Sequence, residues 1–138
     1  MIQRFTVQEI HAAINSLPDL TINGFKCKEA SKKIITAPTF EDLRCAFYDP
    51  VHLDQINTAG IFLLTCDISM EGSYGVKHSM ERWGRVNGGV SYVTNGCAIV
   101  AAKLDGYQII RIANSPNCYF SKNPSNKNQA RSLGRRVW

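Results

Sequence analysis

No hydrophobic stretch in this sequence is long enough to cross a lipid bilayer. The longest one, residues 59–66, contains a glycine and a threonine, whereas a membrane-spanning helix needs about 20 apolar residues. The chain starts Met-Ile-Gln-Arg-Phe-Thr and continues into a helical pattern, without the apolar core of a signal peptide. We therefore expect a cytoplasmic protein that does not contact membranes.

Close pairs of metal-binding residues are missing too. The five cysteines form no Cys-x-x-Cys pair, and the three histidines are isolated from one another. Structural zinc sites usually contain such pairs, so we expect no metal and no cofactor. An odd number of cysteines without a signal peptide is typical of free thiols in a reducing compartment.

The sequence also lacks the signatures of common enzyme classes. It has no Gly-x-Ser-x-Gly motif, no Walker loop for phosphate and no paired metal-binding carboxylates. His78 could act as a general base with Asp67 or Glu71 nearby in the chain. Cys97 could act as a nucleophile, but it lies in an apolar run where burial would keep the thiol unreactive. A small enzyme that uses residues 67–85 is therefore only the third hypothesis.

Acidic residues are scarce in the second half of the chain. Residues 76–138 hold ten Lys/Arg and two acids, a net charge of +8, whereas residues 1–75 hold six Lys/Arg and nine acids, a net charge of −3. Such an asymmetry can direct a polyanion or an acidic protein surface to one side of the molecule. The simpler alternative is that the basic residues only keep the protein in solution.

The length and composition are those of one globular domain. Hydrophobic residues make up 44% and charged residues 20% of the 138 residues, both typical of folded domains. Thr6 and Glu9 form a capping box at the start of an amphipathic helical pattern that ends before Pro18. The pair Asn23-Gly24 predicts a β-hairpin turn.

The middle of the chain predicts two helices, a strand and a loop. Short helices are expected over residues 40–47 and 50–56, the second with a proline in its first turn. Residues 60–69 are largely apolar without alternation, which indicates a strand covered on both faces. Residues 71–89 hold half of the ten glycines and are expected to form a mobile loop, within which residues 79–85 could form a short helix.

The clearest strand pattern covers residues 90–113. Two turn-forming pairs, Asn95-Gly96 and Asp105-Gly106, separate three runs of strand length, as in an antiparallel meander. Residues 118–120 could add a short edge segment. The expected fold is a single α+β domain over residues 1–138, with an antiparallel sheet that includes this meander and with the N-terminal and C-terminal helices packed on it.

A basic helix is expected at the C-terminus, over residues 124–137. At 100° per residue, Ala130, Leu133 and Val137 fall on one apolar face. The cations occupy a separate stripe and the opposite flank, at Lys127, Arg131, Arg135 and Arg136. The helix could therefore dock through its apolar face while it presents four cations to an anionic partner.

Cations beside aromatic rings suit a nucleic acid, because cations neutralise phosphates and rings stack on bases. The leading hypothesis is a small, basic, non-catalytic protein that binds nucleic acid or a phosphorylated, nucleotide-like ligand through its C-terminal half. The candidate ligand-binding residues are Lys77, Arg82, Arg85, Tyr119, Phe120, Lys122, Lys127, Arg131, Arg135 and Arg136.

Two alternatives remain open at this point. Tyr92 and Tyr107 could be cross-strand partners in the meander and Trp83 a core residue, since aromatic residues at strand spacing usually have such roles. The basic half could also belong to a protein-interaction module or an inhibitor that meets an acidic surface on a larger partner, as small proteins of mobile elements do. Composition does not separate this from nucleic-acid binding, and it leaves the oligomeric state open.

Overall fold

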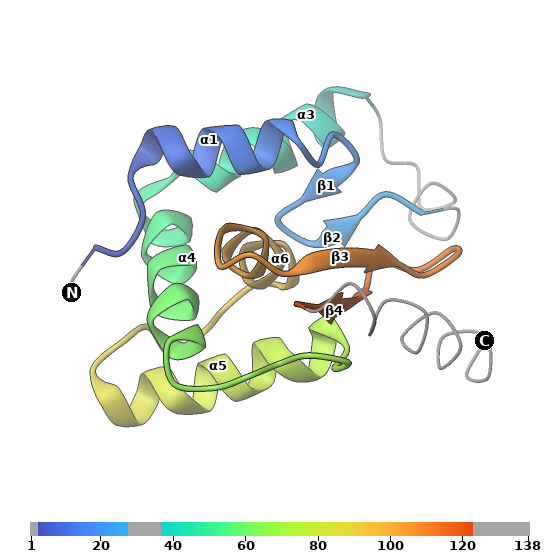
Figure 1. The fold of residues 1–138 in the computed structure, drawn as a ribbon. Helices are drawn as coiled ribbons and strands as arrows, with labels where there is room; N and C mark the ends of the chain where they lie inside the picture. The colour runs from blue at the N-terminus through green and yellow to red at the C-terminus, as the bar shows by residue number, and fades with distance from the viewer. Residues whose placement is uncertain (1–2, 28–36, 123–138) are drawn as a thin grey trace.

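The structure is a computed structural model that describes residues 3–27 and 37–122 (Figure 1). These residues form an α+β fold of five α-helices, one 3-10 helix and two antiparallel sheets of two strands each. The helices are α1 (Val7–Asn15), α3 (Ala37–Cys45), η1 (Ala46–Tyr48), α4 (Pro50–Leu63), α5 (Ser73–Asn87) and α6 (Asn95–Leu104). The strands are β1 (Leu20–Thr21), β2 (Gly24–Phe25), β3 (Gln108–Arg111) and β4 (Cys118–Ser121). The predicted α+β class is confirmed.

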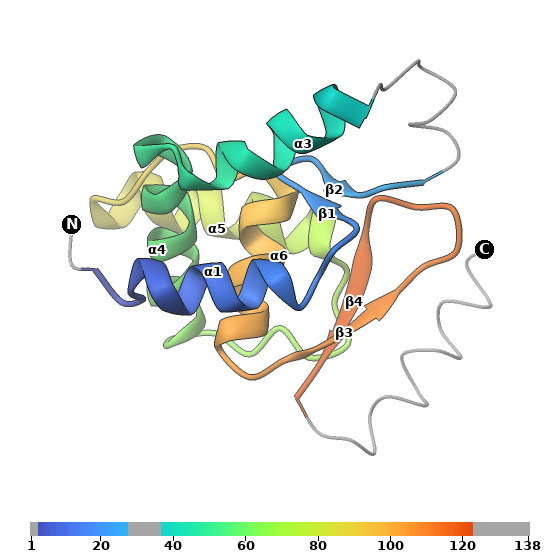
Figure 2. The same cartoon turned by 90° about the horizontal axis from the view of Figure 1, so that it is seen from above.

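Helix α6 lies at the centre of the fold. Figures 1 and 2 show it between α1 on one side and α5 on the other, with α4 beside it. Strands β2 and β3 also contact it. Residues 97–102 are completely buried, and several of them are small enough to let neighbouring helices approach closely. The hydrophobic core is therefore built around a helix and not on the face of a sheet.

The three-stranded meander predicted over residues 90–113 is wrong. Asn95-Gly96 does not form a hairpin turn but begins α6, where the hydroxyl of the N-cap residue Thr94 accepts a hydrogen bond from the Cys97 N–H at 3.1 Å. Only the last of the three runs forms a strand, β3, and it pairs with β4. Because all sides of α6 are buried, its sequence shows no helical periodicity, and an apolar run of this length cannot be distinguished from a strand.

The buried strand predicted over residues 60–69 is wrong, because residues 60–63 end α4 and residues 64–67 are exposed. Helix α4 continues from Pro50 to Leu63, and its residues 55–60 are all buried. The mobile loop predicted over residues 71–89 contains helix α5 instead. Its buried side recurs at helical spacing, at Val76, Met80 and Gly84, a pattern that the high glycine content conceals in the sequence.

Several local predictions agree with the structure. Helix α1 carries both hydrogen bonds of the capping box between Thr6 and Glu9, at 2.9 and 3.1 Å. The first hairpin is present, although Ile22 and Asn23 lie between its strands and Gly24 begins β2. Residues 118–120 belong to a strand, as expected. Helix α1 packs on α6 and not on a sheet, and the helix predicted over residues 124–137 lies outside the described residues.

Among the helices of residues 3–27 and 37–122, none combines the length and the apolar character that a membrane span requires.

Candidate functional site

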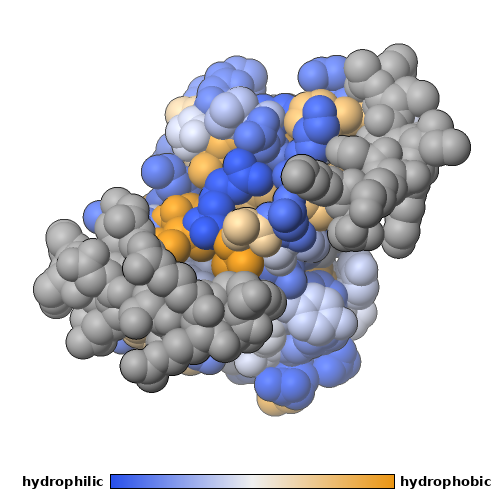
Figure 3. Space-filling model, turned by 90° about the vertical axis from the view of Figure 1, so that its right-hand side faces the viewer, coloured by the Kyte–Doolittle hydropathy of each residue, from blue (hydrophilic) through white to orange (hydrophobic). Residues whose placement is uncertain are grey.

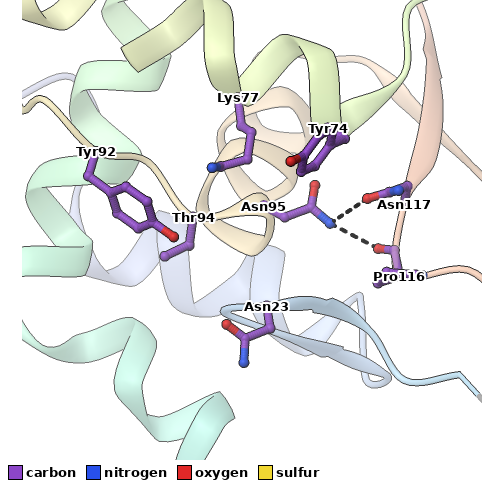
Figure 4. A pocket seen from close by; sticks show the side chains of 8 residues that line it. All are labelled: Asn23, Tyr74, Lys77, Tyr92, Thr94, Asn95, Pro116 and Asn117. Atoms are coloured by element: carbon purple, nitrogen blue, oxygen red, sulfur yellow. Dashed lines mark hydrogen bonds between the residues drawn. The ribbon is translucent and has the colours of Figure 1, made fainter. Parts of the chain in front are cut away.

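A pocket of about 300 Å³ opens at the N-terminal end of α6 (Figure 4). Four segments that are far apart in the sequence meet there: the β1–β2 turn, the start of α5, the segment that leads into α6, and the connection between β3 and β4. The lining residues are Asn23, Tyr74, Lys77, Tyr92, Thr94, Asn95, Pro116 and Asn117.

Two glycines allow the first hairpin to form one wall of this pocket. The Gly96 N–H donates to the carbonyl oxygen of Ile22 at 2.9 Å, and a Cβ at Gly96 would lie 2.0 Å from the carbonyl oxygen of Thr21. Gly24 has a φ of +116°, and a Cβ there would lie 2.5 Å from the carbonyl oxygen of Pro116. Any side chain at either position would push the segments apart, so both positions require glycine.

Lys77 and Glu81 form a buried ion pair beside the pocket. The Lys77 Nζ lies 3.1 Å from Oε2 of Glu81, and the two residues are only 7% and 6% exposed. The same carboxylate oxygen accepts the Val93 N–H at 3.0 Å, and Oε1 lies 3.0 Å from Nδ1 of His78. Burial acts to raise the pKa of Glu81, but these hydrogen bonds and the charge of Lys77 outweigh it, so the pKa lies below its usual value.

The amide of Asn95 has one buried atom without a hydrogen-bond partner. Its Nδ2 donates to the carbonyl oxygen of Pro116 at 3.1 Å and to Oδ1 of Asn117 at 3.0 Å. Its Oδ1 is buried and accepts no hydrogen bond from the described residues. A buried acceptor left in this state costs about 1–3 kcal/mol, and such atoms are rare in folded proteins. Figure 4 shows this oxygen pointing toward the side of the pocket where Lys77 and Tyr74 lie.

Two tyrosine rings stand at the rim of the pocket. Tyr74 and Tyr92 are each 59% exposed, and their ring centroids lie 5.9 and 4.7 Å from the Nζ of Lys77. The ring of His78 packs edge-on against Tyr74, with centroids 4.6 Å apart. The pocket thus combines a cation, an unused acceptor and two exposed aromatic faces.

Two arginines extend this surface along α5. Arg82 and Arg85 are exposed. Arg82 donates to Oγ of Ser79 and Arg85 to the carbonyl oxygen of Ser91. No carboxylate of the described residues pairs with either arginine, whereas Glu81 neutralises Lys77. The positive charge available to a ligand therefore comes from these arginines.

The right-hand side of the molecule in Figure 1 carries the two β-hairpins. Hydrophilic side chains prevail on the visible part of that side, around a small hydrophobic area (Figure 3).

The residues predicted to bind a ligand do not all come together. Lys77, Arg82 and Arg85 all lie on α5, and Lys77 is the one of the three that lines the pocket. Lys122 lies elsewhere, 2.9 Å from Oδ2 of Asp105 and over the ring of Tyr107. Phe120 is completely buried in the core, so it offers no stacking face.

Of the remaining candidates, Tyr119 is half-buried in β4. The other four lie outside the described residues, at Lys127, Arg131, Arg135 and Arg136.

The candidate catalytic groups are placed as follows. Burial raises the pKa of the Cys97 thiol to about 12, so it is not an activated nucleophile. His78 contacts Glu81 rather than Asp67, whose carboxylate accepts hydrogen bonds from Ser69 and Tyr107. Within residues 3–27 and 37–122, no three His, Cys, Asp or Glu side chains gather closely enough to hold a metal ion.

Sequence reasoning missed the central residues of the pocket. The sequence predicts a strand at Thr94 and a turn at Asn95, whereas both residues line the pocket. One signal could have identified them: a threonine before a run of small apolar residues is typical of a helix N-cap. Trp83 packs against Phe62 with ring centroids 6.3 Å apart, in agreement with the core alternative.

Comparisons of the sequence with protein-family models and with curated proteins, and of the fold with solved structures, found no match, so the chain is not assigned to a family.

Proposed function

We propose that this protein is a non-catalytic binding protein for single-stranded nucleic acid, which it holds on the exposed side of α5 and at the pocket beside it. Tyr74 and Tyr92 would stack on bases, and Arg82 and Arg85 would contact phosphates. This proposal does not depend on the basic C-terminal residues, which lie outside the described part of the chain.

The exposed tyrosine pair is the observation that carries the proposal. Large aromatic side chains usually bury most of their surface, yet Tyr74 and Tyr92 each leave 59% exposed. They come from different elements, α5 and the segment before α6, and they flank the same lysine. Exposed rings beside cations are the arrangement with which proteins hold unpaired bases.

The arginines are placed to contact the backbone of such a strand. Tyr74, His78 and Arg82 follow one another at four-residue intervals on α5, so they lie along one side of the helix. Arg85 is one turn further on. A strand whose bases meet the tyrosines could therefore run along α5 with its phosphates near the two guanidinium groups, which favour bidentate phosphate contacts.

A single strand fits this surface better than a duplex. Bases in a duplex are stacked inside the helix and cannot reach an aromatic platform. The two tandem helices α3 and α4 do not offer a helix-turn-helix alternative, because most of α4 is buried in the core.

The test is fluorescence anisotropy with labelled oligonucleotides. We expect single-stranded RNA or DNA to bind more tightly than the duplex of the same sequence, and binding to weaken between 50 and 200 mM salt. The slope of log K against log salt is negative, and Arg85→Ala should make it less negative by about 0.7, the value for one phosphate contact in a single strand. Tyr92→Ala should cost about 1–3 kcal/mol of binding free energy, as expected for one stacked base.

Lys103→Ala is the matched control. Lys103 is exposed in the last turn of α6, at the end away from the pocket, so this variant loses the same charge as Arg85→Ala. If both variants weaken binding equally, only net charge matters and the site is wrong. If no oligonucleotide binds at 50 mM salt, the proposal fails, and an acidic protein partner becomes the better hypothesis.

A further inference from the structure

The unused oxygen of Asn95 has a fixed position. Because Nδ2 donates to two oxygens, one on Pro116 and one on Asn117, rotating the amide by 180° would bring Oδ1 against both acceptors. The hydrogen bonds therefore determine which atom of the Asn95 amide is the oxygen and which is the nitrogen. Asn95 is only 8% exposed, so its oxygen is held in place before any ligand arrives.

This oxygen selects the part of a ligand that can enter the pocket. An amide oxygen accepts hydrogen bonds and cannot donate them. A phosphate group at neutral pH offers mainly acceptor oxygens, so it would not satisfy Oδ1. A nucleobase carries N–H donors on its ring or its exocyclic amine. The phosphate of a bound strand thus belongs outside the pocket, on the side of Arg82 and Arg85.

The remaining walls fit a planar group. Tyr74 and Tyr92 stand at the rim, and the Nζ of Lys77 lies between them, within 6 Å of both ring centroids. Lys77 has three N–H donors, and Glu81 is its carboxylate partner among the described residues, which leaves donors for a carbonyl or ring nitrogen of a base. A volume of about 300 Å³ is at the lower end for a small-molecule site, which suits one base-sized group.

We infer that the pocket at the start of α6 is the subsite for one unstacked base of the bound strand, and that Asn95 Oδ1 accepts a hydrogen bond from an N–H of this base. The base enters from the side of Tyr74, whose side chain is 59% exposed. This inference rests on the proposed function, since it names what one part of that binding surface recognises.

Changing the ligand tests this inference without disturbing the fold. Three nine-nucleotide RNAs of equal charge are compared: oligouridine, the same strand built of N3-methyluridine, which has no N–H on its base, and the fully abasic strand. A second series compares oligoadenosine with the same strand built of N6,N6-dimethyladenosine, which has no N–H on its base. This series tests whether the pocket prefers a purine. Because every position is substituted, the strand cannot avoid the effect by sliding. We expect the methylated strand to bind about tenfold more weakly than its parent in at least one series.

Each outcome decides a different point. If the methylated and parent strands bind equally in both series, Asn95 does not read an N–H and the inference is overturned. If the abasic strand also binds as well as its parent, neither the pocket nor the two tyrosines bind a base, and only the phosphate contacts of the proposed function remain. If no parent strand binds at low salt, the proposed function itself fails.

A protein variant supplies the second readout. In Asn95→Ala, we expect the tenfold difference between parent and methylated strands to disappear while salt-dependent binding remains. Circular dichroism confirms that the variant is folded. Should Asn95→Ala not fold, the comparison of parent and methylated strands on the unchanged protein still decides the inference, because it needs no variant. A difference that persists in the folded variant overturns the inference.

Discussion

Lys77 and Glu81 lie one turn apart on α5 and neutralise each other inside the protein, with Nζ 3.1 Å from Oε2. Glu81 also accepts the N–H of Val93, the residue just before the N-cap of α6. The pair therefore joins α5 to the segment that starts the central helix. Because both groups are more than nine-tenths buried, neither can lose its partner without leaving an uncompensated charge in the interior.

Replacing Glu81 should destabilise the fold strongly. In Glu81→Gln the charge of Lys77 stays buried without an anion, and breaking a buried pair in this way costs about 3–5 kcal/mol. Urea denaturation at pH 7 measures the change. Glu71→Gln, which removes an exposed carboxylate nearby, should change the free energy of unfolding by less than about 0.5 kcal/mol. Equal effects of the two variants would show that the buried pair is not important for stability.

The contribution of Glu81 should also depend on pH. The pKa of Glu81 is lowered in the folded protein from a reference value of 4.5. A group with a lowered pKa stabilises the fold above its unfolded pKa, and this contribution is lost as the pH falls through the folded pKa. The gap in unfolding free energy between the wild type and Glu81→Gln should therefore narrow below about pH 4.5. A gap that stays constant from pH 7 to pH 3 would contradict the lowered pKa.

The N-cap of the central helix should be measurable by itself. Thr94→Ala removes the hydroxyl that accepts the Cys97 N–H, and the loss of a threonine cap costs about 0.5–2 kcal/mol. Thr6→Ala at the exposed start of α1 serves as the comparison, since it removes an equivalent bond to Glu9. We expect the larger loss at Thr94, because the Cys97 N–H is left buried. Thermal or urea unfolding that ranks Thr6→Ala as the more damaging variant would disagree with this.

The cysteines should differ sharply in reactivity. Burial raises the pKa of the Cys97 and Cys118 thiols to about 12, whereas Cys45 and Cys66 are exposed. In the native protein at pH 8, N-ethylmaleimide should modify the two exposed thiols and leave the two buried ones unmodified until urea is added. Peptide mapping by mass spectrometry gives the result for each residue. Labelling of Cys97 as fast as Cys66 would revive it as a candidate nucleophile.

Two glycines on neighbouring helices should respond oppositely to alanine. Gly96→Ala places a Cβ against the Thr21 carbonyl oxygen and should destabilise the protein by about 1–3 kcal/mol or more. Gly75 lies in the first turn of α5 with open space around it, so Gly75→Ala should be neutral or stabilise the fold by up to about 1 kcal/mol. Unfolding by urea measures both. A tolerated alanine at position 96 would mean that the hairpin does not pack there as described.

The features that could be predicted from the sequence are those that depend on residues close together in the chain. The capping box of α1 needs only Thr6 and Glu9, and the first hairpin follows from a turn-forming pair. The α+β class also follows, because both kinds of local signal are present. The basic character of the second half is a property of composition, although the four cations on which that hypothesis relied most lie outside the described residues.

The helix predicted from residue 50 is present as the start of α4. The end of α4 and the whole of α6 could not be distinguished from strands in this way. A helix reveals itself by contrast between a buried and an exposed side, and residues 97–102 are buried on every side. The Asn-Gly pair at position 95 is equally suited to a hairpin turn and to a helix start. Tertiary packing favours the helix over the hairpin, because α6 fills the space between α1, α4 and α5.

The sequence by itself thus determined the class of the fold, its local caps and turns, and its uneven charge. Only the tertiary structure decided which helix is central, which cations are neutralised and where the pocket lies. Asn23, Tyr74, Asn95 and Asn117 come from four separate segments, and each is unremarkable in the sequence. They form a candidate site because long-range packing through Gly24 and Gly96 brings their segments together. Local sequence patterns do not predict such contacts.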